Sequence, residues 1–174
     1  MGAMDISPAI RPQLVVDIVR LAGAWEDVTD ESLARAARAA FVAVRGDAAP
    51  SEVSLLLTDD AQMSALNKSW RGEDGSTNVL SFPLDAPQDG AGPEALGDVV
   101  LACETVAREA AEYGVAAGQH AAHLVVHALL HLMGYDHISD QEAEKMEHLE
   151  VSILGSLGLA NPYSLQSPAD GEGQ

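Results

Sequence analysis

The sequence of 174 residues has little cysteine, few basic residues and no long apolar run. Its only cysteine, Cys103, has no partner for an internal disulfide, which argues against a small secreted scaffold held by disulfides. No leader of the secretory type is recognisable, and no run of about 18 apolar residues could span a bilayer. We therefore expect a soluble protein with no membrane partner, most simply a cytoplasmic one.

Basic residues are scarce relative to acidic ones. There are 9 Lys and Arg residues against 27 Asp and Glu, which gives a net charge of −18 with histidine neutral. Such a charge repels polyanions and argues against a general nucleic-acid binder, because affinity of that kind comes mainly from neutralising phosphates. A local basic surface is still compatible with the sequence, since five of the cations are grouped: Arg35, Arg38, Arg45, Lys68 and Arg71.

Apolar residues, in contrast, are plentiful. They make up 47% of the chain and charged residues only 21%, which is enough to bury a core and excludes disorder for most of the sequence. The length suits one domain, and no internal repeat or long linker divides it. We predict a single domain over residues 11–163, with flexible termini at 1–10 and 164–174.

Hydrophobic periodicity predicts an α+β fold, with a small mixed sheet of about four strands and helices packed against it. The predicted strands are residues 14–19, 53–57, 78–83 and 96–101, the first of which is apolar enough to be buried on both faces. The predicted helices are residues 30–44, 59–70, 104–113, 119–133 and 139–157. Their expected N-caps include Asp30, Asp59 and Ser139, the last two with capping-box partners three residues later.

Four of the six histidines lie between residues 123 and 137. On a helix, His127 and His131 differ by roughly 400° and project from one face, a single turn apart. Gly134 is placed where a helix commonly ends in a left-handed turn, which would bring His137 back toward the same point. Three imidazoles that leave one position to water are typical of a catalytic zinc site, whereas a structural site usually has four protein ligands.

Other interpretations of these histidines stay open. Two histidines at this spacing occur by chance, but the glycine turn and the third histidine favour a metal site. His123 shares the helix face. Two functional roles, supporting a ligand histidine or facing the substrate, compete there with simple packing. Ala128 follows His127, so the glutamate that serves as general base in His-Glu-x-x-His proteases is missing. A metal can itself activate water, which keeps phosphodiester hydrolysis feasible.

Three blocks of sequence carry a family resemblance. His127, His131 and His137, with Gly134-Tyr135-Asp136 before the last, resemble the signature of the YbeY family of metal-dependent endoribonucleases. Two further blocks match in the family's order: Leu66-Asn67 with Trp70-Arg71-Gly72 and residues 77–83, and then Leu96-Gly97-Asp98-Val99-Val100. The chain departs from the pattern at Ala128, where the family usually has glycine, a change that adds one methyl group beside the metal site.

The resemblance implies a zincin-like fold and a single-strand-specific endoribonuclease holding one zinc ion on His127, His131 and His137. Zinc-activated water would attack the phosphodiester, while Arg71 would bind phosphate through parallel hydrogen bonds. Asp98, Asp136 and His123 are weaker candidates for orienting a ligand or facing substrate. A site of three imidazoles would also accept nickel or copper.

The resemblance further implies a role in maturation of ribosomal RNA, notably the 3′ end of the small-subunit RNA, and in ribosome quality control. Expected partners are ribosomal RNA, the small ribosomal subunit, a small-subunit ribosomal protein and a ribosome-associated GTPase. Two alternatives remain: a non-catalytic ribosome assembly factor with a structural metal, and a metal-dependent hydrolase of another substrate such as a peptide or small ester, which the missing glutamate disfavours.

Overall fold

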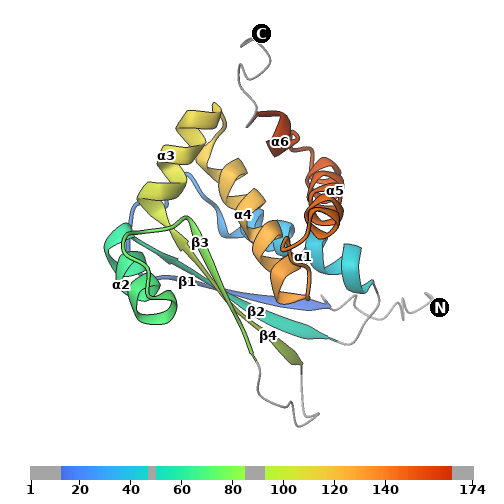
Figure 1. Ribbon diagram of the computed structural model, residues 1–174, viewed down its shortest axis with the longest axis horizontal. Helices are drawn as coiled ribbons and strands as arrows, with labels where there is room; N and C mark the ends of the chain where they lie inside the picture. Colours follow the sequence, from blue (N-terminus) through green and yellow to red (C-terminus); the bar gives the residue numbers. More distant parts are fainter. Residues whose placement is uncertain (1–12, 47–49, 85–92, 166–174) are drawn as a thin grey trace, which may run out of the picture.

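The computed structural model describes residues 13–46, 50–84 and 93–165 (Figure 1). The strands are β1 (Leu14–Arg20), β2 (Ser51–Thr58), β3 (Val79–Pro83) and β4 (Glu94–Ala102). The helices are α1 (Asp30–Arg45), α2 (Asp60–Arg71), α3 (Cys103–Tyr113), α4 (Ala117–Leu132), α5 (Asp140–Ser156) and α6 (Pro162–Leu165). No described helix is both long and apolar enough to cross a lipid bilayer.

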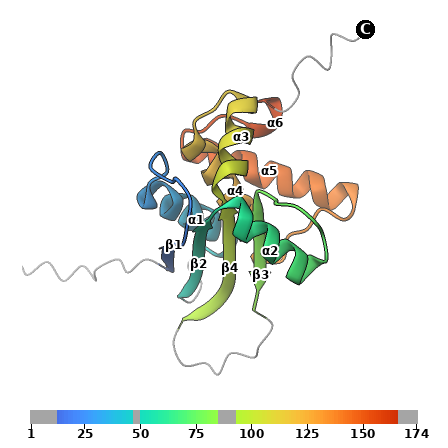
Figure 2. The same ribbon diagram turned by 90° about the vertical axis from the view of Figure 1, so that its left-hand side faces the viewer.

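The four strands form one mixed sheet in the order β1-β2-β4-β3 (Figure 2). β1, β2 and β4 run parallel, and β3 runs antiparallel to β4 at one edge. This confirms the predicted α+β class and the small mixed sheet. The Pro, Gly and Asp residues between positions 85 and 93 predict a loop, and residues 85–92 lie outside the described part of the chain.

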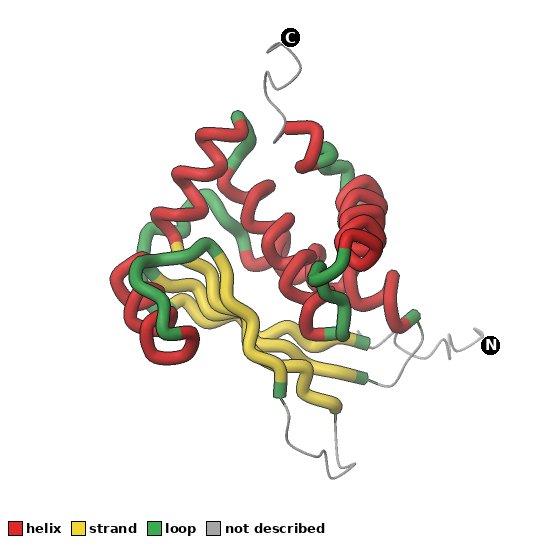
Figure 3. Tube along the Cα trace, viewed as in Figure 1, coloured by secondary structure: helices red, strands yellow, loops and turns green. Residues whose placement is uncertain are grey.

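Helices cover both faces of the sheet unequally. α1 and α4 pack on one face, with α5 against them, while α2 lies on the other face (Figures 1 and 3). The main core lies between the sheet and the first group of helices, and Phe41, Leu55 and Leu129 are fully buried in it. A smaller cluster of Met63, Leu80, Val100 and Ala102 lies beneath α2. α4 is therefore the central helix, buried along most of its length.

One glycine lets the edge strand approach β4 closely. Gly97 has φ +143°, and a Cβ atom there would lie 2.2 Å from the carbonyl oxygen of Phe82 on β3. The pairing between β2 and β4 changes register next to this position. Only glycine fits such a close backbone contact, which fixes β3 as one wall of the site described below.

The structure corrects several local predictions. β1 is an edge strand and Val15 is 47% exposed, so the expected burial on both faces is wrong. α1 is capped by Thr29, whose hydroxyl accepts a hydrogen bond from the amide of Ser32, whereas Asp30 is the first helical residue and pairs with Arg20. Thr29 fills the cap because its backbone is extended, as a cap requires.

Two other caps are as predicted. The side chains of Asp59 and Ser139 accept hydrogen bonds from amides three residues later, at 2.9 and 3.1 Å. Short helix α6 was not predicted, and it extends two residues past the predicted domain boundary at residue 163. Residues 1–10 and 166–174, also expected to be flexible, lie outside the described residues.

Candidate metal centre

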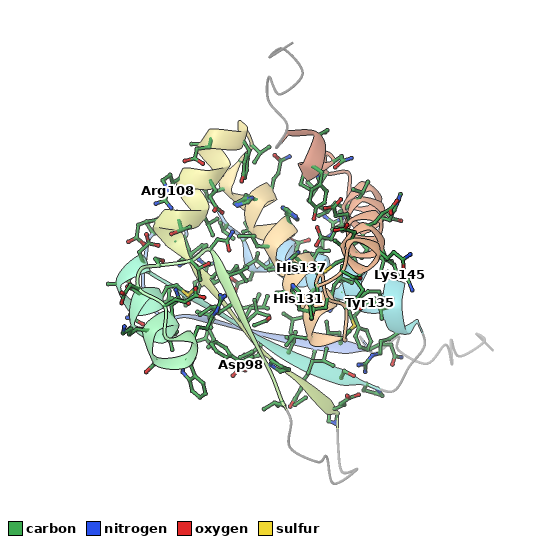
Figure 4. The ribbon with its side chains drawn as sticks, in the orientation of Figure 1. Asp98, Arg108, His131, Tyr135, His137 and Lys145 are labelled. Carbon is green, nitrogen blue, oxygen red and sulfur yellow. The ribbon has the colours of Figure 1, made fainter. Side chains whose placement is uncertain are left out.

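Three histidines converge at the C-terminal end of α4. His127 and His131 come from the helix, and His137 comes from the loop that follows it; one ligand atom from each lies within 4.8 Å of the others. Gly134 has φ +101°, and the amide of Tyr135 bonds to the carbonyl of Leu130 at 3.0 Å, which turns the chain back toward the helix. His131 and His137 accordingly lie side by side in Figure 4, with ring centroids 5.1 Å apart.

Hydrogen bonds fix which nitrogen of each helical ring faces the centre. Nδ1 of His127 donates to the carboxylate of Glu150, and Nδ1 of His131 donates to the carbonyl of Tyr135 at 3.0 Å. The two Nε2 atoms therefore carry lone pairs, yet they lie only 3.0 Å apart. Two lone pairs at this distance repel each other unless a cation lies near both. The donor set and its tautomers thus fit a divalent metal ion.

The surroundings of His131 favour the neutral form of its ring. Burial, together with the nearby imidazoles of His127 and His137, lowers the pKa of His131 below its usual value of 6.5. A neutral imidazole is the form that coordinates a metal, because a proton on Nε2 would compete for the same lone pair. His131 is therefore in the form that binds a metal at neutral pH.

Glu150 on α5 is a buried residue of the site that the sequence analysis missed. It is fully buried and accepts hydrogen bonds from His127, from Nε2 of His123 at 3.3 Å and from the hydroxyl of Tyr163. Burial opposes its ionisation, but these three hydrogen bonds lower its pKa to about 2. A sequence signal did exist, because this glutamate occupies the buried face of a helix otherwise lined there by Met146, Ile153 and Leu154.

The structure places His123 behind the ligands. It is buried one turn before His127 on α4, and its Nε2 bonds to the carboxylate of Glu150. His120, one turn further back, bonds through Nε2 to Glu109 at 2.8 Å. Burial lowers the pKa of His120 despite this carboxylate.

The three histidines form one wall of an open cleft of about 590 Å³. The cleft is also lined by β3 with the residue before it, Asn78, and by Arg71 at the end of α2. The guanidinium of Arg71 is about half exposed, and the carboxylate of Glu73 lies 3.5 Å from it. The structure thus brings Arg71 and the three histidines, predicted from segments some 60 residues apart in the sequence, to one cavity.

The remaining predicted residues differ in their placement. Asp136 lines the cleft, and its carboxylate accepts a hydrogen bond from the amide of His137 at 2.7 Å, which shapes the loop that carries this histidine. Asp98 is not brought to the site. It is exposed and alternates along β4 with Val99, which packs toward α4, so it lies on the other face of the sheet from His131 and His137 (Figure 4).

The structure also places Ala128 and the basic residues that are grouped in the sequence. Ala128 lines the cleft and is 1% exposed, so its methyl group occupies space at the site. Arg38 donates to the carbonyl of Leu14, and Arg45 pairs with Glu94 at 3.0 Å. Arg71 is the one Lys or Arg among the described residues that lines the cleft. The local basic surface compatible with the sequence does not form around these histidines.

Comparison with known proteins identifies the relatives of this chain. A family model described as Endoribonuclease YbeY matches residues 22–158. A protein named Endoribonuclease YbeY from Parvibaculum lavamentivorans is 47% identical over 163 residues, covering 89% of this chain and 88% of the relative. Another with the same name, from Rhodospirillum rubrum, is 51% identical over 156 residues, covering 82% and 78%.

A solved structure supports the fold. The solution structure of TM1509 from Thermotoga maritima aligns with a TM-score of 0.52 at 24% identity, covering 82% of this chain and 91% of that one. This likeness concerns the arrangement of helices and strands. The match of the family model over most of the sequence, together with relatives that are nearly half identical, shows that this chain belongs to the YbeY family of endoribonucleases.

Proposed function

We propose that this protein is a metal-dependent endoribonuclease specific for single-stranded RNA. The observation that carries the proposal is the convergence of His127, His131 and His137, with ligand atoms within 4.8 Å of one another, on the wall of an open cleft. Relatives that cover most of the chain carry the name of an RNA-cleaving enzyme, which favours this substrate over a peptide or small ester.

The three histidines would hold one zinc ion through ring nitrogens, two of them already oriented by Glu150 and the carbonyl of Tyr135. When bound, zinc would supply Lewis-acid polarisation and activate a water for attack on phosphorus. The residues that orient the rings lower the cost of assembling the site, since the ligand rings need not reorganise on binding.

Arg71 is the residue proposed to bind the phosphate. A guanidinium can hold two phosphate oxygens by parallel hydrogen bonds and offset the charge that grows on them as the bond to the nucleophile forms. The long 3.5 Å contact with Glu73 is easily exchanged for such a ligand. No other Lys or Arg of the described residues lines the cleft, so this role falls to Arg71.

The proposed substrate in the cell is ribosomal RNA, at the 3′ end of the small-subunit RNA, together with RNA of defective ribosomes. A net charge of −18 weakens binding to free RNA, so affinity would come from the small subunit, a ribosomal protein or a ribosome-associated GTPase. Such a role would place the protein in the cytoplasm.

The experiment compares matched substrates under one set of conditions. Purified protein is incubated with single-stranded RNA, the same sequence as a duplex, single-stranded DNA and an unstructured peptide, with and without chelator. We expect chelator-sensitive cleavage of the single-stranded RNA alone. Cleavage of the peptide would support the alternative hydrolase. Binding of the wild type and of His131→Ala to purified small subunits is measured alongside. If no substrate is cleaved and both proteins bind the small subunit, the result would support the assembly factor.

A further inference from the structure

A second pocket lies directly beside the three-histidine group. Its volume is about 270 Å³, and it shares Asn78, Val79 and His127 with the larger cleft. The two cavities therefore meet at a ligand histidine. The pocket extends from there along α4, because His123 and His120 also line it and lie four and seven residues before His127, roughly 6 and 10 Å of helix rise.

The walls of this pocket are rich in aromatic rings. Tyr113 lies 5.4 Å from His120, His120 lies 6.0 Å from His123, and His123 lies 6.0 Å from Tyr163, all measured between ring centroids. All four rings line the pocket. Unpaired nucleobases of RNA are recognised by stacking on such side chains, tyrosine and histidine included, and by hydrogen bonds to their edges.

Charge determines which part of a nucleotide this pocket suits. No Lys or Arg of the described residues lines it, while two carboxylates support its walls: Glu109, bonded to Asn78 and His120, and Glu150, bonded to His123 and Tyr163. A phosphate would be repelled by these carboxylates and would find no cation. A neutral, planar base would not be repelled by these carboxylates and would not need a cation. Arg71, in the neighbouring cleft, is the cation that suits the phosphate.

The walls are also held in place before any ligand arrives. Glu109 links the loop before β3 to α4 through Asn78 and His120, at 2.9 and 2.8 Å. Glu150 links α4 to α5 and α6 through His123 and Tyr163. A preformed pocket of this kind binds with little loss of side-chain freedom, which favours specific recognition.

We propose that this pocket is the subsite for one unpaired nucleobase, that of a nucleotide next to the phosphate that is cut. The proposal rests on the proposed ribonuclease function and deepens it. A base within a duplex must first be unstacked and unpaired before it enters a side pocket, and this cost gives a structural reason for preferring single strands.

A first experiment couples substrate and protein changes. A single-stranded RNA with one mapped cleavage site is made with one abasic nucleotide at successive positions around the cut bond. For the wild type we expect kcat/KM to fall about tenfold at one flanking position and little elsewhere, as expected for one lost base–aromatic stack. In Tyr113→Leu, which removes one ring at the exposed end of α3, that penalty should shrink to less than about threefold.

The matched control is Trp70→Leu, which removes an aromatic ring that is 69% exposed and does not line the pocket. This variant should show the same fall in kcat/KM at the abasic position as the wild type, even if its kcat/KM for intact RNA differs. Equal tolerance of abasic nucleotides at all positions by the wild type, or an unchanged penalty in Tyr113→Leu, would overturn the subsite.

A second experiment does not depend on cleavage. His131→Ala removes a proposed metal ligand that does not line the side pocket, so intact RNA can be bound without being cut. Short RNAs carrying 2-aminopurine at successive positions should show fluorescence quenching on binding at one position, and this should be lost in His131→Ala combined with Tyr113→Leu. Quenching without any wild-type cleavage would refute the proposed function and keep the subsite, whereas cleavage without position-specific quenching would refute the subsite alone.

Discussion

The carboxylate of Glu150 on α5 accepts a hydrogen bond from Nδ1 of His127 on α4. The bond joins two helices and leaves Nε2 of the ring facing the centre of the three-histidine group. Because the same carboxylate also accepts hydrogen bonds from His123 and Tyr163, the fully buried charge of Glu150 has three donors around it. Glu150 therefore both stabilises the packing of α5 on α4 and fixes one ligand ring.

Replacing this carboxylate should weaken metal binding. In Glu150→Gln the amide can satisfy only some of the three donors, and the ring of His127 loses its charged partner. We expect zinc affinity to fall about 10- to 100-fold, with a loss of about 1–3 kcal/mol in the free energy of unfolding. Competition with a chromophoric chelator measures the affinity.

The matched control is Glu109→Gln, which changes a carboxylate bonded to His120 and Asn78 and to none of the three convergent histidines. Its zinc affinity should stay within about twofold of the wild type, since distant changes act independently. A Glu150→Gln protein that is folded and binds zinc as tightly as the wild type would show that the bond to His127 does not position the ring.

Arg71→Ala should separate metal binding from cleavage. The side chain is half exposed and weakly paired, so the free energy of unfolding should change by less than about 0.5 kcal/mol and zinc content should not change. Cleavage should fall about 100-fold or more, the usual loss when one stabilising donor is removed from a reacting centre. Arg35→Ala, on α1 and outside the cleft, serves as the control. Normal cleavage by Arg71→Ala would remove this residue from the phosphate site.

Gly97→Ala should deform the wall of the cleft. A Cβ atom would meet the carbonyl oxygen of Phe82 at 2.2 Å, and alanine is strained at φ +143°, so we expect a loss of about 2 kcal/mol or more in urea denaturation. Gly155→Ala on α5 has open space around the added methyl group and should stabilise the protein by about 0.5–1 kcal/mol. If both variants were equally stable, β3 would not be held against β4 at this contact.

The metal-free protein should lose stability as the pH falls below about 6.5. Burial lowers the pKa of His120, and burial with neighbouring imidazoles lowers that of His131, from the usual 6.5. Below that pH the unfolded chain binds more protons than the folded one, so the free energy of unfolding decreases until the folded pKa is passed. Urea denaturation with chelator at several pH values measures the slope.

The control for this pH dependence is His120→Gln, which keeps an amide donor for Glu109 but has no titrating ring. Its stability should decrease less steeply between about pH 6.5 and 5 than that of the wild type. Identical slopes for the two proteins would show that His120 does not contribute to the pH dependence.

The three-histidine group could be predicted from the sequence because it depends on local spacing. His127, His131, the turn at Gly134 and His137 lie within eleven residues, so helical geometry and one glycine are enough to bring them together. The place of Arg71 beside them followed from family resemblance alone. Metal binding by the histidines and phosphate binding by Arg71 stay predictions.

The parts that were missed depend on contacts between distant segments. Periodicity indicates that Glu150 is buried but not what it contacts, because Glu150 and Tyr163 reach the site only where α5 and α6 fold back on α4. Asp98 was a candidate because its neighbours in sequence match a family block, yet strand alternation turns it to the other face of the sheet. The burial of β1 was overestimated because an apolar run does not say whether a strand is central or at an edge.

The most direct test measures zinc content and RNA cleavage together in wild type, His131→Ala and His148→Ala, purified identically and assayed with and without chelator. His148 is exposed on α5, and its variant should match the wild type. We expect about one zinc ion per chain and chelator-sensitive cleavage in the wild type, with both lost in His131→Ala. Cleavage by His131→Ala at the wild-type rate would contradict the account, because the activity would then not depend on the three-histidine site.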